Sequence, residues 1–334
     1  MLAMRAEVLY NIGMKPSLRR LALFLSLLLL LSGCSGLHAC LHANDPDARQ
    51  AERDALSEKL IVQRPTAFPA VSEPALTVTV LDVGQGDCIL LVSPSGKTML
   101  VDAGPSGSFG RIDAAIRESG AERLDAVVAT HPHEDHIGSM AAVLGAYPVG
   151  TFYTIADEQA TSWYAAMTAA LDRNGCAVCI VKAGMTIPWD DGCTVTVLAP
   201  IAYENEPVGM NDRSIVLHVR YGDTAVLLAG DAEETSETRM LNAFPKSMLH
   251  ANVLKLGHHG SSSSTGPSFF LAVDPDFAVA SCGADNDYGH PHPETLSLLY
   301  ETHTAFYRTD LDGSITFRLD GQNVAVGVSR KETP

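Results

Sequence analysis

The sequence predicts an α/β fold built as a four-layer αββα sandwich. Short β-rich runs separated by turn signals form two mixed halves, and stretches of helical length and pattern lie between the runs. Two such halves with helices outside them are expected to stack sheet on sheet. The chain has 334 residues, 46% hydrophobic and 19% charged, which excludes intrinsic disorder and collagen-like structure.

The regular elements begin at Leu76, where polar sequence gives way to aliphatic and β-branched runs. Turn signals at Gly84, Gly86 and 94–96 separate the first three runs. Strands are expected at 76–83, 88–92, 98–104, 124–129, 151–155, 177–181, 193–198, 214–221, 224–229, 253–256, 277–280, 314–319 and 324–328. Helices are expected at 111–119, 137–146, 159–173, 232–242 and 293–302. The last two strands have the spacing of a hairpin.

Residues 1–33 have the pattern of an export signal. An apolar run of 11 residues, 21–31, follows Lys15, Arg19 and Arg20. A membrane-spanning helix needs about 20 apolar residues, so the run favours a cleaved signal, with an uncleaved anchor helix as the alternative. Its end, Leu-Ser-Gly-Cys34, resembles the lipobox of bacterial lipoproteins. That resemblance implies lipidation of Cys34 and an exported protein anchored to a membrane, facing the cell surface or the periplasm.

Residues 34–75 are polar and repeatedly broken by proline, which predicts a tether between the lipid and a domain at 76–334. A short helix is expected within the tether, around 47–60. Cleavage would remove four Lys or Arg and one Glu, so the formal charge would fall from −16 to −19. This acidity argues against a protein that holds nucleic acid by bulk electrostatics.

Cys176, Cys179 and Cys193 lie close together in the sequence. Thiols outside the cytoplasm tend to pair, and no histidine lies nearby to complete a zinc knuckle. A local disulfide or inert thiols are therefore both favoured over a metal site at these cysteines.

Three histidines and an aspartate fall within six positions of the segment 130–138, directly after the apolar run 124–129. Alternating His131 and His133 can bind one metal ion, and Asp135 with His136 can bind a second. Mixed imidazole and carboxylate ligands suit zinc, with manganese or iron as alternatives. The competing interpretation is a histidine-rich surface loop.

The pattern His131-x-His133-x-Asp135-His136 resembles the signature of hydrolases with the metallo-β-lactamase fold. The resemblance implies that Asp102 supports the metal loop and that Asp231, after another buried strand, bridges two divalent ions. It also implies that one residue of the pair His258-His259 completes the second metal. Of the two, His259 resembles the His-Gly ligand of related hydrolases, which implies that His258 faces the substrate; the opposite assignment is the alternative.

Four further motifs resemble the extracellular hydrolase domain of the DNA-uptake protein ComEC. In chain order they are Val-Gly-Gln-Gly-Asp (83–87), His-His-Gly-Ser (258–261), Tyr-Gly-His-Pro-His (288–292) and Tyr-Arg-Thr-Asp (307–310). The resemblance spans 76–334. No other stretch is apolar enough for a transmembrane bundle, so the expectation is a stand-alone lipoprotein related to that domain.

The sequence departs from the wider fold at the third ligand of the first metal. Between the signature and Asp231 the only histidine is His218, which alternates with apolar residues along its strand. The ComEC-like pattern has an asparagine there, matched by Asn211, and an amide is a weaker ligand than imidazole. His290 or His292 could compensate, or both could be structural.

Two ions sharing Asp231 would hold a bridging hydroxide and polarise an ester, a chemistry that suits phosphodiesters. Asp135, Asp231 and His258 are the expected catalytic residues, with His258 donating to a phosphate oxygen. The predicted function is a metal-dependent phosphodiesterase outside the membrane, with DNA as a candidate substrate. The candidate phosphate-binding cations are scattered; they are Arg213, Lys255 and Arg308. The alternatives are hydrolysis of a small or surface-attached ester, such as a phosphocholine diester or a lactone, and a metal-free binding lipoprotein.

Overall fold

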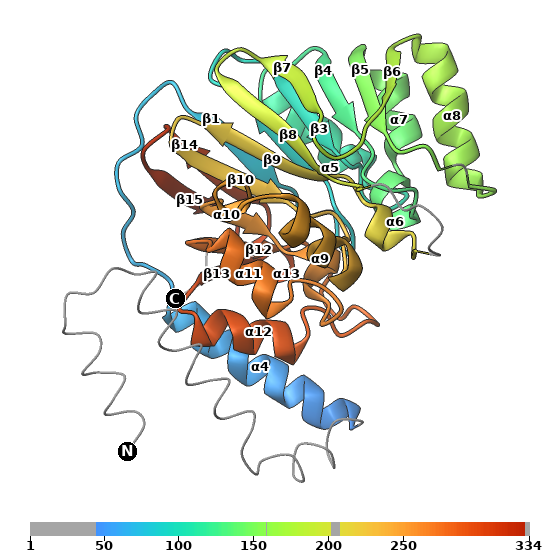
Figure 1. The fold of residues 1–334 in the computed structure, drawn as a ribbon. Helices are drawn as coiled ribbons and strands as arrows, with labels where there is room; N and C mark the ends of the chain where they lie inside the picture. The colour runs from blue at the N-terminus through green and yellow to red at the C-terminus, as the bar shows by residue number, and fades with distance from the viewer. Residues whose placement is uncertain (1–44, 158, 202–207, 331–334) are drawn as a thin grey trace, which may run out of the picture.

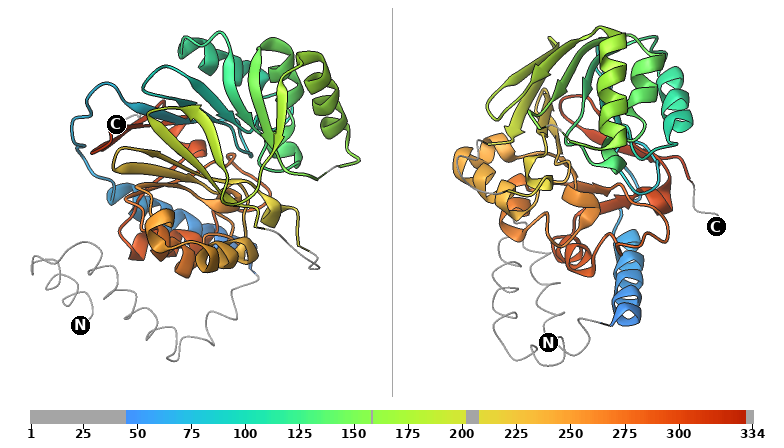
Figure 2. Two further views of the ribbon diagram at one scale, coloured as in Figure 1. Left: turned by 45° about the horizontal axis from the view of Figure 1, so that its top comes forward. Right: turned by 90° about the vertical axis from the view of Figure 1, so that its right-hand side faces the viewer.

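Two β-sheets stacked face to face form the centre of the computed structural model, which describes residues 45–157, 159–201 and 208–330 (Figure 1). Helices cover the outer face of each sheet, as the two views of Figure 2 show. The predicted four-layer αββα sandwich is confirmed.

The first sheet has eight strands in the order β15-β14-β1-β2-β3-β4-β5-β6. Its strands are β1 (Leu76–Val80), β2 (Ile89–Val92), β3 (Thr98–Val101), β4 (Leu124–Val128), β5 (Val149–Thr154), β6 (Ala177–Ile180), β14 (Ile315–Leu319) and β15 (Val324–Val328). Strands β3 to β6 run parallel, and their outer face packs against helices. These helices are α5 (Phe109–Glu118), α7 (Met140–Ala146) and α8 (Ser162–Asn174).

The second sheet has seven strands in the order β13-β12-β11-β10-β9-β8-β7. Its strands are β7 (Thr186–Asp190), β8 (Cys193–Ala199), β9 (Val216–Tyr221), β10 (Thr224–Leu228), β11 (Val253–Lys255), β12 (Phe277–Ala280) and β13 (Ala305–Arg308). Strands β10 to β13 are parallel. The helices associated with this half are α4 (Pro46–Val62), α9 (Glu234–Ala243), α10 (Lys246–Leu249), α11 (Pro267–Val273), α12 (Pro293–Glu301) and α13 (Thr309–Asp312).

The space between the sheets is filled by alternate residues of their strands. In β1, Leu76, Val78 and Val80 are buried between the sheets, while the intervening threonines are partly exposed. Across the gap they share one cluster with residues such as Leu217 and Val219 of β9. Side chains alternate along a strand, so burying the apolar residues between the sheets fixes the register of each strand. It also fixes the direction in which the polar residues of the strand point.

The sequence did not predict β7, α11 or β13. Pro188 lies inside β7 and cannot donate to a ladder, so it argues against a strand. The structure places β7 at the edge of the second sheet, where a missing donor is tolerated. Strand β13 is short and forms the opposite edge.

The interpretation of residues 45–75 as a solvated tether requires correction. The expected short helix is present as α4, but it lies along α12 and β13 (Figure 1). Leu56 and Leu60 join the apolar cluster beneath the outer helices, and Arg64 forms a bidentate ion pair with Asp312. This segment is thus packed on the domain. The predicted signal peptide and Cys34 lie outside the described residues.

No helix among the described residues is long and apolar enough to cross a membrane. The cysteines of the described segments, Cys88, Cys176, Cys179, Cys193 and Cys282, are all free thiols. The sequence favoured either a local disulfide or inert thiols in the cysteine cluster. The structure contains unpaired thiols there and no disulfide among the described residues.

The parallel strands determine where the polar loops meet. The loops after β3 and β4 leave the first sheet, and the loops after β10 and β11 leave the second. The carboxyl ends of parallel strands lie at one edge of a sheet, so each sheet presents two loops to the same region. The six residues expected to bind the metals directly lie in the segments that follow β4, β10 and β11, whereas Asn211, His290 and His292 lie in the segments that follow β8 and β12.

Candidate metal centre

His131 and His133 lie in the loop between β4 and the short helix α6 (Glu134–Ile137), for which His133 is the N-cap. The extended backbone of this loop turns the two rings toward each other, with His131 Nε2 2.9 Å from His133 Nδ1. His131 Nε2 is also 3.7 Å from Asp231 Oδ2. These three side chains form the first group of converging candidate ligands.

Asp135, His136, Asp231 and His259 form the second group. His136 Nε2 lies 3.2 Å from Asp231 Oδ1, and His259 Nε2 lies 3.1 Å from Asp135 Oδ2 and 3.6 Å from Asp231 Oδ1. Asp231 belongs to both groups, one oxygen facing each. This is the arrangement required of a carboxylate that bridges two metal ions.

The chemistry of these residues fits a pair of divalent cations. Within each group the candidate ligand atoms lie within 4.8 Å of one another. His136 Nε2 and Asp231 Oδ1 are buried and have no hydrogen-bond partner among the described residues. Buried polar atoms are rarely left unsatisfied, and a metal ion between them would satisfy both. Imidazole and carboxylate ligands are those of zinc and of the harder transition metals.

Asp102 holds the His-rich loop from behind. Its backbone adopts a left-handed conformation with φ of 59°, directly after β3. Its carboxylate accepts from the backbone and hydroxyl of Thr130 at 2.8 and 2.7 Å, and from His136 Nδ1 at 2.7 Å. The last bond directs the proton to Nδ1 of His136 and leaves Nε2 free for a metal.

The turn after β11 separates the roles of two adjacent histidines. His258 and His259 both have left-handed backbones, with φ of 46° and 56°, so their rings leave the turn in different directions. His259 is buried and its Nδ1 bonds the backbone oxygen of Ser281 at 2.9 Å. His258 is a quarter exposed, with Nε2 3.8 Å from Asp231 Oδ2 and Nδ1 3.0 Å from Glu233 Oε1. The structure thus places His259 in the second ligand group and His258 at its rim.

Two supporting features have no clear signal in the sequence. Glu233, close to Asp231 in the chain, accepts from Ser263 as well as contacting His258. Asp87 lies 3.3 Å from His259 Nδ1 and forms a fully buried ion pair with Lys255 at 2.8 Å. The motif at 83–87 is visible in the sequence, but the role of Asp87 within it depends on contact with Lys255, which lies far along the chain.

Gly86 explains why that motif requires a glycine. Its φ is 144°, and a Cβ at this position would lie 2.3 Å from the backbone oxygen of Asp135. The backbone N–H of Asp87 donates to the same oxygen at 3.1 Å. The loop between β1 and β2 therefore packs closely against the backbone of Asp135 and holds it in place, and only glycine at position 86 allows this approach.

The buried charges of these side chains shift one another's pKa values. Burial lowers the pKa of His136, but Asp231, Asp102 and Asp135 outweigh it and raise that pKa well above its ordinary value. For His259 burial is likewise outweighed by Asp231 and other carboxylates, which raise the pKa to about 9. Burial and neighbouring His136 lower the pKa of His131. Protons on His136 and His259 thus stand where cations would bind.

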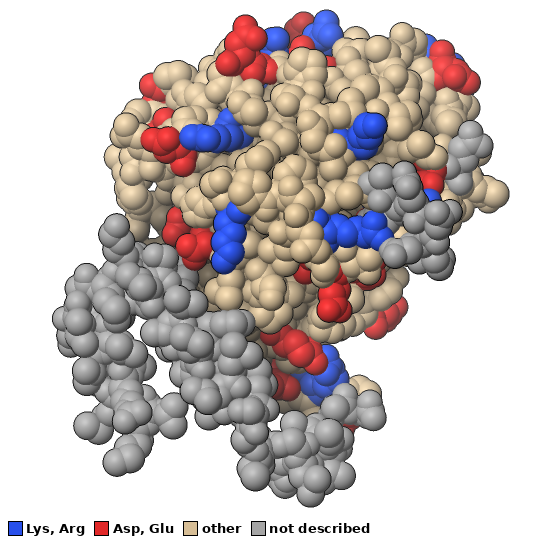
Figure 3. All heavy atoms as spheres, viewed as in Figure 1, with Lys and Arg blue, Asp and Glu red and all other residues tan. Residues whose placement is uncertain are grey.

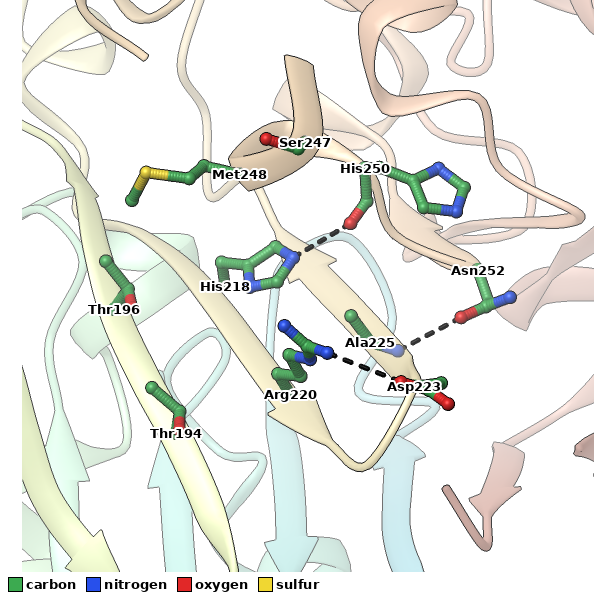
Figure 4. Close-up of a pocket in the computed structure, with 10 residues that line it drawn as sticks. All are labelled: Thr194, Thr196, His218, Arg220, Asp223, Ala225, Ser247, Met248, His250 and Asn252. Atoms are coloured by element: carbon green, nitrogen blue, oxygen red, sulfur yellow. Dashed lines mark hydrogen bonds and ion pairs between the residues drawn. The ribbon is translucent and has the colours of Figure 1, made fainter. Parts of the chain in front are cut away.

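Among the described residues, neither His218 nor any other histidine adds a third imidazole to the first ligand group. Figure 4 shows His218 in a separate pocket of ≈ 310 Å³ lined by β8, β9, β10 and the segment 247–252, with Nε2 donating to the His250 backbone oxygen at 2.9 Å. Asn211 instead lies beside the rim, its Nδ2 3.5 Å from His258 Nδ1. Its Oδ1 is buried and has no partner in the described part of the chain.

His290 and His292 occupy different positions. His292 has both nitrogens engaged, Nδ1 by the backbone of Ser262 at 2.9 Å and Nε2 by the backbone oxygen of Tyr288 at 3.0 Å. The His290 ring contacts those of His258 and His259, at centroid distances of 5.3 and 6.1 Å. Burial and the neighbouring histidines lower the pKa of His290 to about 3, so this ring is neutral.

The three cations suggested as phosphate contacts are all held by protein carboxylates. Lys255 is fully buried against Asp87. Arg213 pairs with Asp157 at 2.6 Å, and the buried Arg308 pairs with Asp310 at 2.6 Å. On the face shown in Figure 3, Lys and Arg side chains are spread apart and several lie beside Asp or Glu. On this face the Lys and Arg side chains of the described residues do not gather into a basic groove.

The sequence is similar to a known superfamily and to known proteins. The profile of the metallo-beta-lactamase superfamily matches residues 81–175, which contain Asp102 and the His-rich loop. The chain is 30% identical to ComE operon protein 3 of Bacillus subtilis over 275 residues and 33% identical to competence protein ComA of Neisseria gonorrhoeae over 257 residues. These matches cover 75% and 77% of this chain but 34% of each relative, so the chain spans about a third of their length.

Among solved structures, the fold is similar to that of CmlA, a diiron β-hydroxylase from Streptomyces venezuelae. The two share 19% identity with a TM-score of 0.50, over 75% of this chain and 55% of CmlA. At this identity the similarity concerns the fold alone.

Proposed function

Because the chain is a ComEC-like member of the metallo-β-lactamase superfamily, we propose that it is a metal-dependent phosphodiesterase. The observation that carries the proposal is the pair of ligand groups that share Asp231. Two cations held by one shared carboxylate would suit an in-line displacement at phosphorus, in which both the attacking and the leaving oxygen need stabilisation.

His131, His133 and Asp231 would hold one ion, and Asp135, His136, Asp231 and His259 the other. When bound, such ions acidify water and polarise the ester, which supplies a nucleophile at neutral pH. The chain's own contribution is to orient these ligands. Asp102 sets the tautomer of His136, and Ser281 with Asp87 positions His259 through Nδ1.

In this proposal His258 moves a proton. Its Nδ1 lies 3.0 Å from Glu233 Oε1, and this hydrogen bond is the first cause that lowers the pKa of the Glu233 carboxyl. The opposite nitrogen, Nε2, lies 3.8 Å from Asp231 at the rim of the site. A proton held at Nε2 can be donated to a phosphate oxygen or to the leaving group.

A second candidate function is the hydrolysis of a small or surface-attached ester. It is favoured by the three cations held by carboxylates and by the formal charge of −16, because a long polyanion would be repelled. As part of the main proposal, the protein acts outside the cytoplasmic membrane, anchored through lipidated Cys34. Retention of Cys34→Ser protein in the membrane fraction would contradict that anchoring.

The test uses the purified protein loaded with zinc or manganese, and bis-p-nitrophenyl phosphate, single-stranded DNA and a p-nitrophenyl carboxylate ester as substrates. We expect turnover of the phosphodiester and a fall of about 100-fold or more for Asp135→Ala, since a lost metal ligand removes several kcal/mol of stabilisation. Asp172→Ala, on the exposed face of α8, is the matched control.

Metal content measured by mass spectrometry accompanies each assay. Less than one metal ion per chain, together with turnover that does not depend on Asp135, would overturn the proposal. Cleavage of the carboxylate ester without either phosphodiester would replace it with the second candidate.

A further inference from the structure

A pocket of ≈ 360 Å³ lies between α4 and the loop that leads into α12. Helix α4 contributes Arg49, Gln50 and Arg53 to its lining, and the loop contributes Tyr288 and His292. Figure 1 shows α4 running alongside α12. The pocket adjoins the metal centre through the loop, because His290 contacts both His258 and His259.

Tyr288 is the exposed aromatic ring of this pocket. Its relative exposure is 67%, the highest of any large aromatic side chain in the described residues. The ring stacks on His290, with centroids 5.6 Å apart and planes inclined by 21°. One face of Tyr288 is therefore supported while most of the ring remains in solvent, which is the geometry of a stacking platform.

Arg53 is the cation of the pocket that lacks an ion pair among the described residues. It is 8% exposed and donates through Nη1 to the backbone oxygen of His290 at 3.1 Å. Its Nε is buried and has no hydrogen-bond partner in the described segments. Arg49, by contrast, is neutralised by a bidentate pair with Glu294. Asp287 is the carboxylate of the lining, and Arg53 forms no ion pair with it.

We propose that this pocket binds a nucleotide that flanks the scissile phosphate of a nucleic-acid strand. The base stacks on Tyr288, and the adjacent phosphate lies against the guanidinium of Arg53. The inference rests on the proposed phosphodiesterase function and names its substrate class. A base has an aromatic face and its phosphate an anionic charge, so a nucleotide satisfies both features at once.

The same two features disfavour a choline-type ester. An aromatic ring alone would attract a quaternary ammonium group through its π-face. Here Arg53 lines the same pocket as the ring, and its positive charge repels such a group and attracts a phosphate.

The first experiment measures binding. The metal-loaded protein is titrated into a fluorescein-labelled phosphorothioate oligothymidylate, and anisotropy gives Kd for wild type, Tyr288→Phe and Tyr288→Leu. We expect Kd to rise about 5- to 100-fold for Tyr288→Leu, since base–aromatic stacking has that magnitude, and to change less than about twofold for Tyr288→Phe. Met248→Ala, at an exposed position on α10, is the control.

Arg53 is tested by its salt dependence, because loss of one phosphate contact lowers the slope of log K against log salt by about 0.7 in single strands. We expect this loss for Arg53→Gln and not for Arg53→Lys, with thermal unfolding confirming that each variant is folded. Wild type that does not bind the oligonucleotide, or equal affinities for wild type and Tyr288→Leu, would overturn the subsite.

A kinetic comparison separates the subsite from the reaction. The p-nitrophenyl esters of thymidine 5′-phosphate and of methyl phosphate share one leaving group, so the ratio of their kcat/KM values reports the contribution of the nucleoside. Tyr288→Leu should lower that ratio about 5-fold or more, and Tyr288→Phe should retain it. A ratio that Tyr288→Leu leaves intact would contradict the proposal. If oligonucleotide binding depends on Tyr288 but neither ester is hydrolysed, the proposed subsite is supported and the proposed phosphodiesterase activity is rejected.

Discussion

At the scale of single residues, Asp102 links the strand framework to the candidate ligands. It is completely buried and accepts three hydrogen bonds, two from Thr130 and one from His136. The left-handed backbone at Asp102 costs some conformational energy, which the surrounding bonds must offset. Such a residue controls the direction of a neighbouring ligand without binding the metal itself.

Asp102→Asn should therefore weaken metal binding while retaining the fold. The amide keeps the size of the side chain but cannot accept from all three donors, so His136 loses its fixed tautomer. We expect metal affinity to fall about 10- to 100-fold, as measured by competition with a chromogenic chelator. Asp172→Asn, an exposed carboxylate on α8, should bind metal as wild type does. Equal affinities for Asp102→Asn and wild type would refute this role.

Local spacing allowed the candidate ligands within 131–136 to be predicted as a group, because these residues are neighbours in the chain. The partners of Lys255 could not be predicted in that way. Its position after an apolar run was compatible with contact to substrate, whereas the fold places it against Asp87, more than a hundred residues earlier. Glu233 is a similar case, since its contact with His258 depends on how two loops of one sheet meet.

At the scale of elements, α4 shows how a polar sequence can conceal a packed helix. Only one narrow stripe of α4 is buried, formed by Arg53, Leu56, Ser57 and Leu60. This stripe has helical spacing, but two of its members are polar and the flanking prolines suggest a linker. Ser57 and Arg53 are buried because they bond the polypeptide beneath them, at Arg308 and at His290. Such partners are visible only in the folded chain.

Leu60→Ala should destabilise the whole domain if α4 is part of it. Leu60 is 1% exposed, and replacing a buried leucine with alanine costs roughly 2–4 kcal/mol through lost burial and a residual cavity. Urea unfolding measures this change. Val62→Ala, at a position 85% exposed in the same helix, should alter the free energy of unfolding by less than about 0.5 kcal/mol. Similar values for the two variants would indicate that α4 does not contribute to the cooperative unit.

At the scale of the whole molecule, the candidate site joins the two halves of the sandwich. Asp135 and His136 come from the first sheet, and Asp231 and His259 come from the second. The two sets of side chains meet at the edge where parallel strands of both sheets end. The fold class could be predicted from the two β-rich halves, but the edge strands β7 and β13 could not, because short strands and Pro188 carry little pattern. A cation bound between the halves would stabilise the folded state, since it binds ligands that only the folded chain brings together.

The pH dependence of that stabilisation follows from the buried histidines. In the metal-free protein the pKa of His259 is raised to about 9 and that of His136 well above its ordinary value of about 6.5. Raised histidine pKa values stabilise the metal-free fold below about pH 6.5, and this contribution is lost as the pH rises toward 9. Metal ions require the same nitrogens without protons, so apparent affinity should rise about tenfold per pH unit for each proton displaced. The increase in Tm caused by a fixed concentration of manganese should therefore grow from pH 6.5 to pH 9, as followed by differential scanning fluorimetry. An increase that is constant or shrinks across this window would show that the metal does not compete with protons on these histidines.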